Sequence, residues 1–111
     1  MADLTITIPD ENDILENGKI LLFAKIEKTQ GIWKINASDD DTWPSHPHAV
    51  RVDKPERLNL FDGTVYSPIN REIKYFMSGK TMRLIYSMIK ALGDKKIFEK
   101  IESHRSEISY L

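Results

Sequence analysis

Residues 81–92 read TMRLIYSMIKAL, and this stretch decides the class of fold. Its apolar side chains recur every three or four positions, which is the spacing of one face of an amphipathic helix: Met82, Ile85, Ile89, Leu92. Thr81 is a suitable N-cap for this helix, and Gly93 is a suitable C-terminal end. Asp94 is placed to cap a further helix, whose expected face is Ile97, Ile101, His104, Ile108. We expect a packing role for His104 there. The C-terminal part is therefore predicted to be helical.

The segment just before it, residues 68–78, is also expected to form a helix. Ser67 and Pro68 suit the N-cap and the first helical position, and Gly79 suits the end. The apolar residues between them lie at helical spacing: Ile69, Ile73, Phe76, Met77.

The N-terminal half has the alternation of strands instead. Residues 4–8, LTITI, alternate strictly between apolar and polar side chains, which predicts a half-buried strand that Pro9 ends. Residues 10–18 are expected to be a connector or one short helical turn. Residues 19–28 and 32–37 predict two further strands, joined by a turn at residues 29–31 to form a hairpin.

Residues 38–48 contain Pro44 and Pro47, which exclude a helix or a central strand and predict an ordered loop. Short strands are expected at residues 50–52, 58–60 and 65–66, with an Asp-Gly turn before the last. The complete prediction is a single α+β domain over residues 1–111. A small antiparallel sheet in the N-terminal half packs against two or three C-terminal helices.

Composition excludes several classes of protein. The chain has no cysteine, which removes disulfides, zinc–thiolate sites and thiol catalysis. Its longest apolar run, residues 20–24, is far short of the roughly 20 residues that span a membrane. The first residues have no basic segment before an apolar one, so no signal peptide is expected. We therefore expect a cytoplasmic protein that has no membrane partner and no cofactor.

The net charge of −1 conceals a separation of charge. Residues 1–62 have twelve acidic and seven basic side chains, whereas residues 63–111 have nine basic and five acidic ones. An acidic face complements a basic protein, and basic helices with interleaved tyrosines complement phosphates or an acidic protein. A protein partner is therefore expected, and RNA is a second partner that the composition allows.

Histidines in the loop are the candidates for chemistry. Histidine titrates near neutral pH and serves as acid, base or metal ligand. His46 and His48 are two positions apart, so in an extended chain both side chains would project to one side. A metal site is not predicted, because no other histidine-rich segment completes it. If the protein is a metal-independent ribonuclease, the expected catalytic residues are His48, His46, Arg51, Tyr66.

The candidates for partner binding are charged residues of both halves and one aromatic residue: Asp39, Asp40, Asp41, Trp43, Arg71, Lys74, Arg83, Lys90.

Residues 43–50, WPSHPHAV, and residues 58–66, LNLFDGTVY, resemble a group of small bacterial proteins. Those proteins have a W-P-S-x-P-H-x-H loop and a following K-L-D-L-x-T-G-x-I-Y hairpin. The loop is also loosely similar to that of toxin–antitoxin proteins. This chain departs from the pattern at Val50, where the resemblance would place the second histidine.

The resemblance and the charge separation favour a protein of a toxin–antitoxin or toxin–immunity system. Such a protein would bind its partner through charge-complementary surfaces. The alternative is a ribonuclease toxin that uses the His46/His48 loop for acid–base catalysis.

Overall fold

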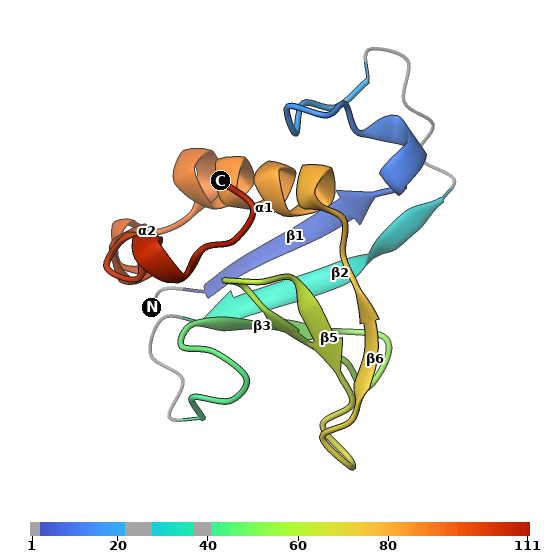
Figure 1. Ribbon diagram of the computed structural model, residues 1–111, viewed down its shortest axis with the longest axis vertical. Coiled ribbons are helices and arrows are strands. Elements are labelled where there is room, and N and C mark those ends of the chain that lie inside the picture. The colour runs from blue at the N-terminus through green and yellow to red at the C-terminus, as the bar shows by residue number, and fades with distance from the viewer. Residues whose placement is uncertain (1–2, 22–27, 37–40) are drawn as a thin grey trace.

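The computed structural model describes residues 3–21, 28–36 and 41–111 (Figure 1). One antiparallel sheet has six strands in the order in which they occur along the chain: β1 (Asp3–Pro9), β2 (Thr29–Asn36), β3 (His48–Arg51), β4 (Arg57–Asn59), β5 (Thr64–Tyr66), β6 (Ile73–Phe76). Two α-helices and two short 3-10 helices complete the description: α1 (Gly79–Leu92), α2 (Lys95–Glu102), η1 (Glu11–Asp13), η2 (Arg105–Glu107). The predicted α+β arrangement is confirmed.

Helix α1 lies along β1, and β3, β5 and β6 lie beyond β2 on the side away from α1 (Figure 1). The alternation in β1 has the predicted result, since Leu4, Ile6 and Ile8 are buried while the residues between them are exposed. The apolar face of the helices covers these side chains. Fully buried members of the core come from both layers: Trp33, Ile35, Leu58, Ile85, Ile89, Ile97.

The ends of both α-helices follow from their caps. Ser78, rather than Thr81, is the N-cap of α1, because its hydroxyl accepts a hydrogen bond from the Thr81 amide at 3.3 Å. Gly79 therefore begins a helix instead of ending one. Asp94 caps α2 as predicted, with 2.7 Å between its carboxylate and the Lys96 amide. Four residues are expected on one buried face of the helix that Asp94 caps. Ile97, Ile101 and Ile108 are buried, whereas His104 lies at the surface.

The predicted helix over residues 68–78 is wrong. A turn closed by a hydrogen bond from the Arg71 amide to the Ser67 carbonyl (2.8 Å) leads into β6, which pairs with β5. The residues with helical spacing do not form a buried stripe. Ile69 is 82% exposed, Ile73 55% and Phe76 67%. Pairing with β5 determines this segment, so Ile69, Ile73 and Phe76 remain at the surface, whereas Met77 joins the core.

The turn predicted at residues 29–31 is also wrong, because these residues are the first part of β2. Gly31 has a φ of +105°, and a Cβ there would lie 2.5 Å from Nε of Arg51. A glycine is therefore needed at position 31 because the Arg51 side chain lies close to the backbone there, and not because the chain reverses direction. The strand predicted over residues 19–28 lies partly outside the described residues. Within them, Ile20 makes only an isolated bridge to Ile14.

Candidate functional site

The loop before β3 is fixed by a buried serine. The Ser45 hydroxyl donates to the Pro47 carbonyl at 2.7 Å and accepts from the Leu60 amide at 3.2 Å. The peptide bonds that precede Pro44 and Pro47 are both cis. These hydrogen bonds fix the predicted ordered loop against the end of β4. Three of its side chains, Trp43, His46 and His48, then have separate surroundings.

The two loop histidines line different cavities. His48 is buried and lines a cavity of about 230 Å³ with Lys34, Asn36 and Val50. Its Nδ1 lies 3.0 Å from the Ser45 carbonyl, and since a carbonyl only accepts, Nδ1 carries the proton. His46 lines another cleft, and its Nε2 lies 3.3 Å from Nζ of Lys100. The expected projection of both rings to one side is therefore not observed.

Trp43 is the centre of an aromatic and arginine cluster. Its ring centre lies 5.2 Å from that of Tyr66, and the guanidinium carbons of Arg71 and Arg57 lie 4.6 and 5.7 Å from it. Arg57 also forms an ion pair with Asp41, and this hydrogen bond holds the pKa of the Asp41 carboxyl below its usual value. The structure thus brings together three predicted partner-binding residues and Tyr66, a predicted catalytic residue.

Arg71 has unusual backbone geometry. Its φ is +59°, in the left-handed region that an arginine rarely adopts. Its guanidinium has no ion pair with any described residue and rests only on the Trp43 ring. The exposed Ile69 lies in the same turn, and β6 follows at the edge of the sheet. We call the residues Trp43, Tyr66, Ile69, Arg71, Ile73 and Phe76 the Trp43 surface.

Arg51 and Lys74 belong to a different, structural cluster around Glu56. This carboxylate is only 3% exposed and accepts from Arg51 (2.8 Å), Lys74 (2.7 Å) and the Tyr75 hydroxyl (2.8 Å). A bulge in β6 at Lys74 allows two successive side chains to reach it. Burial raises the pKa of Glu56, but these three hydrogen bonds outweigh burial and hold the pKa below its usual value. Burial and the hydrogen bond to Glu56 raise the pKa of Tyr75 to about 12.

The other predicted binding residues lie elsewhere. Arg83 of α1 donates to the carbonyls of Glu16 and Tyr110, at 2.8 and 3.1 Å, and so ties two segments of the chain together. Lys90 is exposed on α1. Asp39 and Asp40 lie outside the described residues. Sequence reasoning did not place Arg57 beside Trp43, and it assigned Ile69 and Ile73 to a helix rather than to an exposed surface.

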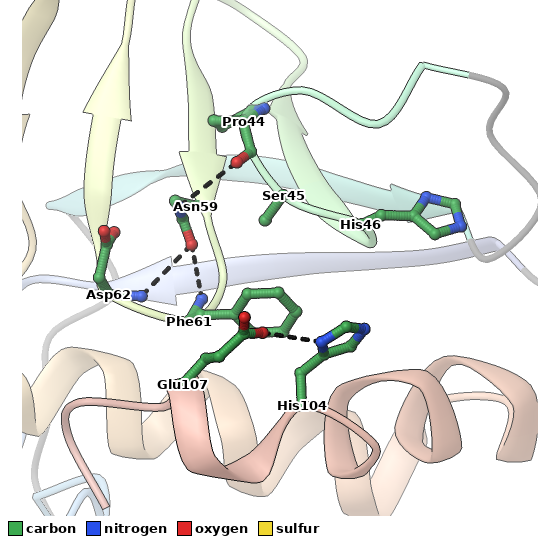
Figure 2. Close-up of a pocket in the computed structure, with 8 residues that line it drawn as sticks. All are labelled: Pro44, Ser45, His46, Asn59, Phe61, Asp62, His104 and Glu107. Carbon is green, nitrogen blue, oxygen red and sulfur yellow. Dashed lines mark hydrogen bonds and ion pairs between the residues drawn. The ribbon is translucent and has the colours of Figure 1, made fainter.

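A second cleft, of about 400 Å³, opens between the loop, the β4–β5 turn and η2 (Figure 2). It is lined by Pro44, Ser45, His46, Asn59, Phe61, Asp62, His104, Glu107. Nδ1 of His104 lies 2.7 Å from a carboxylate oxygen of Glu107, and its ring centre lies 5.1 Å from that of Phe61. The histidine expected to pack in the core thus borders an open cleft together with His46.

Comparison of the chain with protein-family models, with curated proteins and with solved structures found no match in any of the three. In the part of the chain that the structure describes, no group of three or more acidic or histidine side chains could hold a metal ion. No helix among these residues is long and apolar enough to cross a membrane.

Proposed function

We propose that this protein is a binding module that recognises an acidic segment of a protein partner through the Trp43 surface. The observation that carries the proposal is the packing of Arg71 on Trp43, in a turn that also contains the exposed Ile69 and is followed by the exposed Ile73 and Phe76 of β6. Tryptophan, tyrosine and arginine are the residues most enriched among those that dominate binding energy in protein interfaces. Neighbouring apolar side chains at the surface are typical of interaction sites.

The chemistry of Arg71 indicates the kind of partner. A guanidinium that stacks on an indole still presents its N–H groups at its edge, where they can donate in pairs to a carboxylate. No described acidic residue uses them. The edge of β6 also presents backbone groups that no other described strand pairs. An extended acidic segment along this edge fits both features.

The narrower proposal is a role in a toxin–antitoxin or toxin–immunity system. It is supported by the resemblance of residues 43–50 and 58–66 and by the separation of charge along the chain. The ribonuclease alternative remains a prediction. Since His46 and His48 line different cavities, no observation favours a shared acid–base site in this loop.

Affinity capture from the native host tests the proposal. Proteins that bind the wild-type chain are identified by quantitative mass spectrometry and compared with those that bind Arg71→Glu. The matched control, Lys96→Glu, makes the same charge change at an exposed residue of α2. Purified candidates are then titrated against each variant. We expect at least a tenfold loss of affinity for Arg71→Glu and Trp43→Ala and an unchanged affinity for the control.

A partner that binds Arg71→Glu and Trp43→Ala as tightly as the wild type contradicts the proposal. So does capture that disappears after ribonuclease treatment of the lysate, since the bound species is then RNA. Lys90→Glu is titrated as a further variant, because the sequence also predicts a partner-binding role for Lys90 of α1.

A further inference from the structure

The cleft beside η2 has a charge opposite to that of Arg71. Its lining residues include the carboxylates of Asp62 and Glu107 but no lysine or arginine, and Lys100 contacts the lining at the His46 side, where its Nζ lies 3.3 Å from Nε2 of His46. In Figure 2, Asp62 and His46 lie at opposite sides of the cleft, with Phe61, His104 and Glu107 below the loop. None of the lining residues belongs to the Trp43 surface, although both are built on the loop that contains Pro44.

Several polar groups of the cleft already have partners. The Ser45 hydroxyl is used within the loop and by Leu60. The Asn59 amide oxygen accepts from the amides of Phe61 (2.8 Å) and Asp62 (3.3 Å), and its nitrogen donates to the Pro44 carbonyl (3.4 Å), as Figure 2 shows. These groups fix the walls of the cleft and are not available to a ligand. Nδ1 of His46 has no hydrogen-bond partner among the described residues, but it is buried and so does not reach a ligand in the cleft.

The groups that remain are acceptors. Oε2 of Glu107 accepts from His104, and Oδ1 of Asp62 accepts from the Thr64 amide at 2.9 Å. Each carboxylate therefore has a second oxygen that can accept a hydrogen bond from a ligand. Because a carboxylate only accepts, Nδ1 of His104 donates to Glu107. A ligand for this cleft must therefore supply several hydrogen-bond donors and a positive charge.

Aromatic rings determine the shape of such a ligand. The Phe61 and His104 rings are inclined by 33° to one another, and both lie along the cleft. Flat cations bind favourably over aromatic faces, and arginine does so more often than lysine. A guanidinium also has five N–H donors in one plane, whereas a phosphate has only acceptors and the same sign of charge as the two carboxylates.

We propose that this cleft binds an arginine side chain of a protein partner. The inference does not depend on the Trp43 surface, because the residues and the charge that carry it are different. A partner that occupies both sites would need an acidic segment for Arg71 and an arginine for the cleft.

The test uses the full chain and two peptides, acetyl-Gly-Arg-Gly-amide and the same peptide with citrulline. Citrulline has nearly the shape of arginine but no charge and fewer donors. NMR shifts of the His104 ring and of the backbone around Phe61 and Glu107 report binding. We expect saturable shifts with the arginine peptide and affinity at least fivefold lower for the citrulline peptide.

Variants locate the binding. Glu107→Gln should weaken the arginine peptide about fivefold. The matched control, Glu99→Gln, makes the same change at an exposed residue of α2 and should leave the affinity unchanged. Both residues are exposed, so both variants are expected to fold, which amide spectra check. Arg71→Glu should not affect this peptide, so failure here is distinguishable from failure of the Trp43 surface.

Three results would overturn the inference. The first is equal affinity for the arginine and citrulline peptides. The second is an arginine peptide that binds Glu107→Gln as tightly as the wild type. The third is inorganic phosphate or a short RNA shifting the His104 and Phe61 signals where the arginine peptide does not, which would assign the cleft to an anion.

Discussion

The guanidinium of Arg71 rests on the ring of Trp43, with 4.6 Å between its central carbon and the ring centre. It reaches this position from a backbone with a φ of +59°. Left-handed backbone is unfavourable for every residue with a Cβ, so this turn is not the one that stability alone would select. An arginine kept there is consistent with the binding role proposed for its side chain, because strained residues often occur at functional sites.

Two replacements of Arg71 distinguish the cost of its left-handed backbone from the contribution of its contact with Trp43. Arg71→Ala and Arg71→Gly both lose the contact with Trp43, but only glycine adopts the left-handed backbone freely. We expect the glycine variant to be more stable than the alanine variant by about 1 kcal/mol in urea unfolding. Both should lose partner binding equally. A glycine variant less stable than the alanine variant would mean that the turn is not strained.

The pKa of Glu56 predicts how stability depends on pH. The folded pKa lies below the ordinary value of 4.5, so the unfolded chain binds more protons between the two values. The stabilisation is therefore complete above about pH 4.5 and is lost as the pH falls toward the folded pKa. The exposed Asp41 and Asp53, whose pKa values are also lowered, add to the same trend.

Glu56→Gln tests this dependence. Loss of the buried charge leaves Arg51 and Lys74 without their carboxylate, and we expect a loss of about 3 kcal/mol at pH 7. The loss should shrink as the pH falls below about 4.5 toward the folded pKa, because the wild type then loses the stabilisation that its charged carboxylate provides. The control, Asp53→Asn, removes an exposed partner of Arg51 and should cost much less than Glu56→Gln. A Glu56→Gln penalty that is the same at pH 7 and pH 3 would show that the charge is not responsible.

The buried ring of His48 predicts a structural role. His48→Ala removes a side chain that fills space and donates from Nδ1 to Ser45, so we expect a loss of about 2 kcal/mol in urea unfolding. Asparagine has an N–H donor near the position of Nδ1, and His48→Asn should recover part of the loss. A variant that folds with unchanged stability but loses an activity on RNA would instead favour the ribonuclease alternative.

The elements that could be predicted from the sequence are those fixed by local periodicity. The alternation in β1 predicts a buried face, which is confirmed. The stripe predicted in α1 is confirmed at Met82, Ile85 and Ile89 but is wrong at Leu92, which is 67% exposed because it lies at the last turn of the helix. Residues 69–76 have the same helical spacing, yet they form a turn and an edge strand. This segment forms a strand because it pairs with β5, and the pattern of residues within the segment does not indicate that pairing.

The candidate sites depend on contacts between distant parts of the chain. The sequence indicated Trp43 and Arg71 separately, but not that one rests on the other. It singled out His46 with His48, whereas the structure places His46 with His104 around one cleft. Cis bonds at Pro44 and Pro47 accompany this path of the loop, and an extended-chain rule does not describe it.

Gly31 and Glu56 are expected to be coupled through Arg51. A Cβ at position 31 would lie 2.5 Å from Nε and 2.7 Å from Cζ of Arg51, so Gly31→Ala must displace this side chain. Displacement breaks its bond to Glu56, and the positive φ adds strain, so we expect a loss of about 3 kcal/mol. In the Glu56→Gln background the charge attraction in that bond is already lost. Gly31→Ala should then cost about 1 kcal/mol less than in the wild type, as urea unfolding of the four proteins measures.

Gly18→Ala is the matched control for this cycle. Gly18 also has a positive φ, +84°, and a Cβ there would lie 2.9 Å from the backbone of Arg83, far along the chain from Glu56. Its cost should be the same with and without Glu56→Gln, because it disturbs no partner of that carboxylate. Additive losses for Gly31→Ala, as for Gly18→Ala, would show that Arg51 can move without leaving Glu56. The Gly31 effect would then be backbone strain alone.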